Sequence, residues 1–398
     1  MSAADRPPGL PKPPGPLTGV RIVELSGIGP GPFAGMLLAD LGAEVIRVDR
    51  AEGGSMLQAA EPRLDVLGRG KRSIAVDLKS PEGVAAVLDL IATADAVFEG
   101  YRPGVAERLG LGPDVCLDRN PAVVYGRMTG WGQTGPMAPM AGHDIDYISI
   151  AGALHPIGRA GQPPTPPLNL VGDFGGGGVF LAFGMVCAIL SARATGVGQV
   201  VDAAMVDGAS ILMAPFVAMR ASGMWSNERG TNLIDSGAPF YDAYRTADGG
   251  YIAVGAIEPQ FYALLIEGLG LAGEDLPAQM DREQWPVLKA RFTEVIAGRT
   301  RDEWAVVFDG SDACVTPVLE PDEVPENRHM KARDSFVHIA GLLQPRPAPR
   351  FSATPPADPD PAPANGADTR AVLADLGYSA HRVDELLSHG AVVEAGDA

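Results

Sequence analysis

The chain has 398 residues, and at about 150 residues per domain this length predicts two to three domains. Hydrophobic residues make up 46% and charged residues 20%, which excludes a disordered chain and indicates a folded protein. The formal charge of −18 excludes a general electrostatic surface for DNA or RNA, so any phosphate ligand must be bound by local cations.

The cysteines, the apolar segments and the two ends of the chain predict the cellular compartment of the protein. Cys116, Cys187 and Cys314 lie far apart with no CxxC pair, which favours a reducing compartment and argues against structural zinc. The longest apolar run, residues 179–192, is too short to span a bilayer and predicts a buried helix. No secretory or peroxisomal signal is apparent at either end, so we expect a cytoplasmic protein with no membrane or nucleic-acid partner.

The first half of the chain alternates between strand and helix patterns. After a proline-rich tail over residues 1–17, GVRIVEL predicts a strand, PFAGMLLADLG a helix and AEVIRV a second strand. SIAVDL, the amphipathic segment 81–93, ADAVFEG and AVVYGRM continue the same order. This order predicts an α/β fold with a mostly parallel sheet and helices on both faces.

The second half begins with glycine- and proline-rich segments that are typical of sites on loops. A helix is expected over residues 144–154, and GDFGGGG then leads into the apolar helix. Residues 241–261 predict a hairpin with its turn at Asp248–Gly250, followed by a helix in a second, smaller domain.

The segment Gly29–Ala34 fits the pattern G-x-G-x-x-A after a strand, and Asp49 follows where a ribose-binding acid would lie. This pattern alone is typical of a nicotinamide dehydrogenase. Pro30 and Pro32, however, have no N–H group to donate to a pyrophosphate. A tight turn required for packing and a contact with a different nucleotide therefore remain equally favoured.

Seven motifs in fixed order resemble the α-methylacyl-CoA racemases of the class III CoA-transferase family. They are LSGIGPGPFAGMLLADLGAEVIRVDR, GYRPGVAERLGLG, GRMTGWGQTGP, AGHDIDYISI, LVGDFGGGG, GQVVDAAMVDG and GAIEPQFY. The resemblance runs from about residue 16 to residue 325. It implies a Rossmann-like large domain, a smaller α+β domain and an interlocked homodimer with its active site between subunits.

The resemblance also implies site residues. It assigns catalysis to His143, Asp173 and Glu258, and coenzyme A enters as part of the substrate, with no separate cofactor. The implied coenzyme A contacts are Ile28, Arg50, Leu78, Lys79, Arg102 and Arg108, with the backbone near Asp77 against the adenine. The domains expected on this basis are a tail (1–17), a large coenzyme A-binding domain (18–204), a linker helix (205–238), a small domain (239–325) and a return linker with a C-terminal segment packing on the large domain (326–398).

The chemistry of the residues supports a two-base reaction independently. Racemisation beside a thioester requires a base on one face and an acid on the other. His143 and Asp173 each follow a glycine in a loop-rich stretch, and Glu258 could hold the second nitrogen of His143. The backbone N–H of Asp144 could stabilise the enolate oxygen, so no metal is expected.

Purely structural explanations exist for the same residues. His143 could simply begin a helix and bind a carbonyl, and Glu258 before Pro259 could be a surface acid in a first helical turn. Asp173 lies too far from the Val179 helix for a direct cap, so the glycines favour a functional loop.

Cations for the phosphates of coenzyme A concentrate in the first domain. Besides those named above, the candidates are Arg47, Arg69, Lys71 and Arg72, and residues 69–72 form the densest cluster. About half of all these cations are expected to be solvated surface charges.

The sequence therefore predicts a racemase that interconverts the 2R and 2S epimers of 2-methyl-branched acyl-CoA thioesters. One alternative is a class III CoA-transferase in which Asp173 is the nucleophile. A non-enzymatic acyl-CoA-binding protein is a third interpretation, which the acid and base residues in glycine-rich segments disfavour.

Overall fold

The computed structural model describes residues 15–52 and 61–396. These residues divide into two compact units: unit 1 contains residues 15–151, 168–211 and 329–396 apart from the gap, and unit 2 contains residues 152–167 and 212–328. Residues 152–167 thus belong to unit 2, although the sequence places them within a continuous large domain. The predicted tail over residues 1–17 lies mostly outside the described residues.

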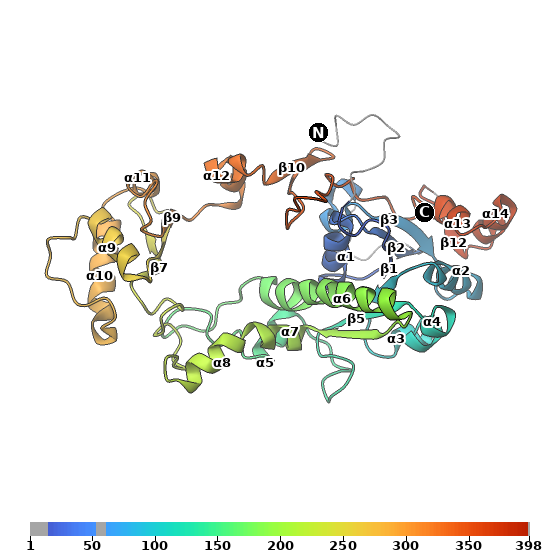
Figure 1. The fold of residues 1–398 in the computed structure, drawn as a ribbon, viewed down its shortest axis with the longest axis horizontal. Coiled ribbons are helices and arrows are strands. Elements are labelled where there is room, and N and C mark those ends of the chain that lie inside the picture. The colour runs from blue at the N-terminus through green and yellow to red at the C-terminus, as the bar shows by residue number, and fades with distance from the viewer. Residues whose placement is uncertain (1–14, 53–60, 397–398) are drawn as a thin grey trace. The chain divides into compact units, whose positions relative to one another are not determined.

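Unit 1 is built on a seven-stranded sheet with the order β12-β3-β2-β1-β4-β5-β6 (Figure 1). The strands are β1 (Arg21–Leu25), β2 (Glu44–Arg50), β3 (Arg72–Val76), β4 (Ala96–Glu99), β5 (Val124–Thr129), β6 (Val200–Ala204) and β12 (Val392–Val393). The first six run parallel, whereas β12 pairs antiparallel with β3. The predicted α/β fold with a mostly parallel sheet is confirmed.

Helices cover both faces of this sheet because successive residues of each strand point to opposite sides. Ile22 and Val23 of β1, for example, belong to two different buried clusters. One cluster includes residues of α2, α4, α13 and α14, and the other includes residues of α1 and α6. The helices of unit 1 are α1 (Pro30–Asp40), α2 (Pro81–Ala92), α3 (Val105–Arg108), α4 (Pro113–Arg119), α5 (Asp144–Ile150), α6 (Val179–Thr195), α7 (Met205–Leu212), α13 (Thr369–Asp375) and α14 (Ala380–Ser388).

The strand order places a topological switch point at β1. The chain moves outward from β1 through β2 and β3 on one side, and through β4, β5 and β6 on the other. In open parallel sheets, ligands bind beyond the carboxyl ends of the strands at such a point. The connections that follow β1 to β5 are therefore where a site is expected.

The apolar helix α6 is longer and more exposed than the sequence predicts. A π-helix, η4 (Leu170–Gly178), runs directly into it, so the helical stretch Leu170–Thr195 has 26 residues and contains an 18-residue window with a mean hydropathy of 1.9. By length and composition this stretch could cross a membrane, and the expectation that it is too short is wrong. Leu181 and Met185 are buried, whereas Phe183 and Leu190 are each 66% exposed. One face of the helix is therefore buried in the core, and apolar side chains on another face are exposed.

Unit 2 contains an antiparallel sheet of β7 (Tyr241–Arg245), β8 (Tyr251–Gly255) and β9 (Val315–Pro317). The hairpin predicted around Asp248–Gly250 is confirmed. Its core packs Phe240, Phe292 and Trp304 together with residues of the sheet. The helices of unit 2 are α8 (Ala214–Ala221), α9 (Pro259–Gly268), α10 (Trp285–Ile296) and α11 (Arg301–Val307). The segment 205–238 therefore holds all of α7 and all of α8 instead of one linker helix.

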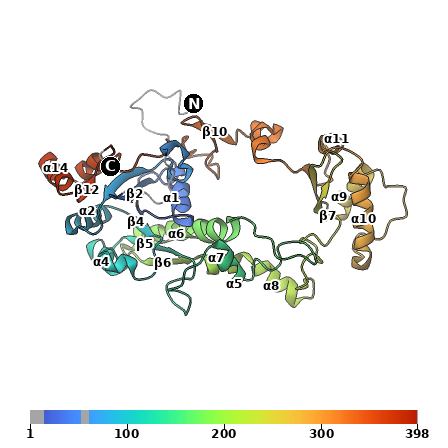
Figure 2. The same cartoon turned by 180° about the vertical axis from the view of Figure 1, so that it is seen from behind.

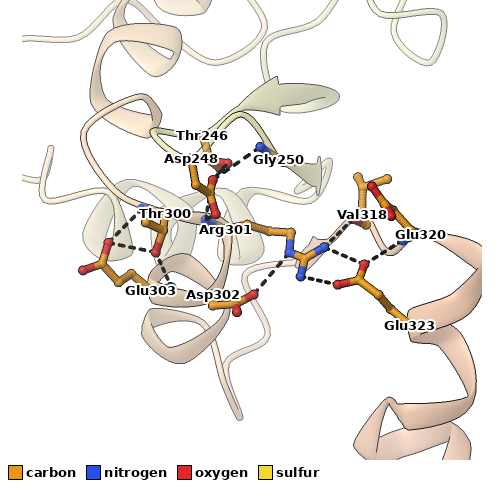
Figure 3. A network of polar contacts seen from close by, with 10 residues as sticks. All are labelled: Thr246, Asp248, Gly250, Thr300, Arg301, Asp302, Glu303, Val318, Glu320 and Glu323. Carbon is orange, nitrogen blue, oxygen red and sulfur yellow. Dashed lines mark hydrogen bonds and ion pairs between the residues drawn. The ribbon is translucent and has the colours of Figure 1, made fainter.

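A polar network ties the hairpin turn of unit 2 to α11 (Figure 3). The N–H of Arg301 donates to Asp248 in the turn, and its guanidinium binds both carboxylate oxygens of Glu323 at 2.6 and 2.7 Å. Thr300 and Glu303 form a capping box at the start of α11. Such a paired network fixes the turn against the helix.

The chain returns to unit 1 at His329, within α12 (Arg328–Ala332). The hairpin β10 (Phe336–Ile339) and β11 (Leu342–Pro345) follows. Then α13 and β12 pack against β3, and α14 lies beside β12 (Figure 2). The C-terminal segment thereby completes the edge of the large sheet.

Candidate active site

Most of the predicted site residues follow the parallel strands of unit 1. Ile28 follows β1, Arg50 ends β2, residues 77–79 follow β3 and Arg102 follows β4. Arg108 lies in α3, on the same connection as Arg102. Because the carboxyl ends of parallel strands meet at one edge, these residues share the edge at which ligands bind in such sheets.

The cations at this edge are available to a ligand. Arg50, Lys79, Arg102 and Arg108 are all exposed, and the side chain of Ile28 is 52% exposed. Lys79 Nζ lies 3.4 Å from the Glu52 carboxylate, and both groups are open to solvent. Asp77 accepts a hydrogen bond from the N–H of Lys79 at 2.9 Å, which shapes the turn after β3.

Four other predicted cations are not available, and this part of the sequence prediction is wrong. Arg47, Arg69 and Lys71 are buried in ion pairs with Asp49, Asp40 and Glu24, respectively. Arg72 is paired with Glu44 and Asp375. Arg69 and Lys71 of the dense cluster therefore neutralise internal carboxylates, because a buried charge requires a partner, whereas the carboxylates paired with Arg72 are partly exposed.

His143 lies directly before α5, as the sequence predicts. It is the N-cap residue, with an extended backbone, and its N–H donates to the Asp146 carboxylate at 2.9 Å. The Asp146 N–H donates back to the His143 carbonyl at 2.9 Å. These bonds occupy backbone groups of His143, and the residue is exposed.

Asp173 lies within the π-helix η4, and the expectation of a loop is wrong. Its N–H donates to Asp144 Oδ1 at 2.7 Å, and its carboxylate accepts from Asn169 Nδ2 at 3.2 Å. Partial burial raises the pKa of Asp173; the Asn169 hydrogen bond opposes this rise, the Asp144 charge adds to it and His143 opposes it. The two predicted bases are thus within electrostatic reach of each other, and Asp173 is biased toward proton uptake.

Glycines allow the backbone to approach Asp173 closely. A Cβ at Gly172 would lie 2.4 Å from Asp144 Oδ1, so a side chain there would collide with the bond that holds Asp173. Gly29 adopts φ 67°, and its Cβ position is 3.4 Å from Asp173 Oδ2. The glycine loop before α1 is therefore part of the wall around Asp173.

Asp144 contributes its carboxylate, a role that sequence reasoning missed. The side chain is buried; Oδ1 accepts from Asp173, and Oδ2 has no hydrogen-bond partner among the described residues. Sequence reasoning assigned only its backbone N–H, which lies in the first turn of α5 and has no acceptor within the helix. The only signal was an acid at the first position of a predicted helix, which is common in all helices.

Tyr147 is influenced by the charges of both Asp173 and Arg102. Burial raises the pKa of Tyr147 to about 12; the charges of Asp173 and Asp146 add to the rise, and Arg102 lowers it. The tyrosine hydroxyl donates to the Gly142 carbonyl, and its ring packs edge-on against Trp131 at 4.8 Å. Arg102 therefore lies within electrostatic reach of the residues beside His143.

Glu258 lies in unit 2, whereas His143, Asp144 and Asp173 lie in unit 1. It is the exposed N-cap residue of α9, with Pro259 in the first turn. Burial raises the pKa of the Cys314 thiol, and the nearby charge of Glu258 adds to that rise. Glu258 and His143 therefore belong to different units.

The comparisons with known proteins agree with this arrangement. The profile of CoA-transferase family III matches residues 17–369. The alpha-methylacyl-CoA racemases of Mus musculus and Homo sapiens are 48% and 46% identical over 375 residues, covering 94% of this chain and 96% of each relative. A crystal structure of a CAIB/BAIF family protein from Brucella suis is similar with a TM-score of 0.79 and 26% identity, covering 91% of this chain and 99% of that chain. The chain therefore belongs to CoA-transferase family III.

Proposed function

We propose that the protein is a racemase that interconverts the 2R and 2S epimers of 2-methylacyl-CoA thioesters. The observation that carries this proposal is the pairing of His143 with Asp173, two different acid–base groups within electrostatic reach at the start of adjacent helical segments. The high identity to two alpha-methylacyl-CoA racemases supports the same reaction.

Each base would act on one epimer. One residue removes the α-proton while the other returns a proton to the opposite face of the carbon. The raised pKa of Asp173 suits this task, since a carboxyl group that titrates nearer neutrality both accepts and donates protons. The enolate formed between the two steps carries negative charge on the thioester oxygen, and the backbone N–H of Asp144 is the donor that we assign to it.

Coenzyme A would bind along the carboxyl edge of the sheet. Its phosphates are anionic, and three exposed arginines lie at that edge: Arg50 at the end of β2, Arg102 after β4 and Arg108 at the end of α3. We assign the turn over residues 77–79 to the adenine end and Ile28 to an apolar contact. We assign Arg102 to a phosphate of coenzyme A, and its charge also opposes the rise that burial causes in the pKa of Tyr147.

We further propose a homodimer in which Glu258 of a second copy orients His143. Two observations support it: Glu258 is exposed in unit 2, and α6 presents Phe183 and Leu190 to the outside. Exposed apolar residues on one helix face are typical of an interface. An interlocked arrangement would cover them.

The second candidate is a CoA-transferase, which the family itself favours. In that reaction the Asp173 carboxylate attacks the thioester carbonyl, and an acyl–aspartyl anhydride forms as the thiolate of coenzyme A leaves. Burial works against this role, because it disfavours the charged, nucleophilic form of Asp173.

Each pure epimer of a 2-methylacyl-CoA, incubated with the wild-type protein in deuterated water, separates the two candidates. The racemase exchanges the α-proton of both epimers and inverts the configuration without any second acid. A transferase leaves the α-proton in place and moves coenzyme A to an added carboxylic acid.

A further inference from the structure

We propose that Lys71 is a positioning residue for Asp173 and acts on it through the first turn of α1. This inference rests on the proposed two-base reaction. It gives a role to Lys71, which is buried in an ion pair with Glu24 and is not available to coenzyme A.

The side chain of Lys71 is fully buried beneath α1. Nζ donates to Glu24 Oε2 at 2.6 Å and to the carbonyl oxygen of Pro32 at 3.0 Å. The Lys71 side chain is 0% exposed and that of Glu24, on β1, is 1% exposed. One ammonium group thus joins the central strand of the sheet to the first turn of α1.

This contact is poorly explained by stability alone. A buried ion pair loses much of its attraction to desolvation, so its net contribution to stability is small. The first turn of a helix also carries the positive end of the dipole, which disfavours a nearby cation. The lysine at this place therefore points to a geometric role, namely fixing where α1 begins.

The helix rests directly on the ion pair. A Cβ at Gly35 would lie 2.1 Å from Glu24 Oε2 and 2.8 Å from Lys71 Nζ. No side chain separates the α1 backbone from the two charged groups at this point. The height of α1 above the sheet is accordingly set by the Lys71–Glu24 pair.

The same end of α1 forms the support for η4. The Cβ position of Gly178 is 2.8 Å from the Pro30 carbonyl oxygen, and that of Gly177 is 3.1 Å from Pro30 Cβ. The rings of Phe33 and Phe174 pack with their centroids 4.5 Å apart. Phe174 directly follows Asp173, so a displacement of the first turn of α1 is transmitted to the catalytic carboxylate.

Arg69 provides a matched control at the other end of the same helix. Its guanidinium binds both oxygens of Asp40, the last residue of α1, at 3.1 and 2.6 Å, and its Nη1 donates to the Pro345 carbonyl. This pair is equally buried, but it lies at the helix end remote from η4. Removing it perturbs α1 without touching the support of Asp173.

The test compares Lys71→Met and the neutral pair Glu24→Gln/Lys71→Met with the control pair Asp40→Asn/Arg69→Met. For each folded variant, α-proton exchange of both epimers is measured in deuterated water. The epimer that no longer exchanges in Asp173→Ala is defined as the Asp173-dependent epimer. We expect the Lys71 variants to lower exchange of that epimer about tenfold more than exchange of the other. The control pair should leave the ratio of the two rates unchanged.

Two results would overturn the inference. One is an equal loss of exchange rate for both epimers in the Lys71 variants, which indicates a merely structural role. The other is an unchanged ratio of the two exchange rates in Glu24→Gln/Lys71→Met, a double variant that keeps the packing volume. If Lys71→Met does not fold, the double variant Glu24→Gln/Lys71→Met alone decides. If the double variant does not fold either, the single variant Glu24→Gln takes its place, because it leaves Lys71 an amide oxygen to bind. Absence of exchange in the wild-type protein would instead refute the proposed function.

Discussion

The substitution Gly172→Ala perturbs the site through one methyl group. The new Cβ would lie 2.4 Å from Asp144 Oδ1, 2.8 Å from Asp144 Cγ and 3.1 Å from Ile148 Cγ2, so Asp144 or the η4 backbone must move. Overpacking of this kind costs about 1–3 kcal/mol of unfolding free energy. Loss of the bond between the Asp173 N–H and the Asp144 carboxylate adds about 1.5–3 kcal/mol, since the acceptor is charged.

The larger effect is expected on catalysis. A displacement of about 1 Å at a reacting group can reduce the rate about 100-fold, and η4 carries Asp173 directly after Gly172. Denaturant unfolding measures the stability loss, and α-proton exchange of each epimer in deuterated water measures the catalytic loss. Gly273→Ala is the control, because a Cβ there meets nothing within 4 Å. Wild-type exchange rates in Gly172→Ala would refute the role of the Asp144–Asp173 contact.

Three further predictions concern the surroundings of the bases. Burial raises the pKa of Glu99 from 4.5 to about 7, although the Tyr101 N–H and Arg127 oppose this rise. The folded chain therefore keeps this proton between those pH values while the unfolded chain loses it, so the unfolding free energy should fall by about 3 kcal/mol as the pH rises from 4.5 to 7. Glu99→Gln should flatten that part of the stability profile in denaturant titrations, and an unchanged slope would contradict the assignment. Arg102→Ala should raise KM for the acyl-CoA far more than it lowers kcat, because a distant phosphate contact stabilises ground and transition states alike; steady-state kinetics with an unchanged KM would remove Arg102 from the site. Asp144→Asn should lower the pKa of Asp173 by removing a neighbouring negative charge, and the acidic limb of the kcat/KM profile for the Asp173-dependent epimer should move to lower pH.

The sheet and its helices could be predicted because their signals are local. Alternating β-branched strands and amphipathic helices mark β1 to β5, and Pro30 and Pro81 mark helix starts. The candidate residues at the carboxyl edge were implied by the resemblance to a known family, and the parallel strand order explains why they lie at one edge. The turn at Asp248–Gly250 could likewise be predicted from the residues that form it.

Features that depend on packing could not be predicted in this way. The sequence DFGGGG predicts a loop, because glycine disfavours helices. In the structure these glycines let η4 pack closely against α1 and α7, where a side chain would not fit. The basic run at residues 69–72 reads as a phosphate site, but the partners of Arg69 and Lys71 lie 29 and 47 residues away in sequence. The carboxylate of Asp144 likewise bonds a backbone group 29 residues away. Only the tertiary fold brings these groups together.

The two-base reaction is tested most directly by α-proton exchange of both pure epimers in deuterated water, measured for the His143→Ala and Asp173→Ala proteins. Neither variant should racemise, because each direction requires one acid and one base. Each should still exchange the epimer whose proton faces the remaining base, so the two variants should show opposite preferences. Racemisation by His143→Ala at the wild-type rate, or a covalent adduct trapped on Asp173 during turnover, would contradict the proposed function.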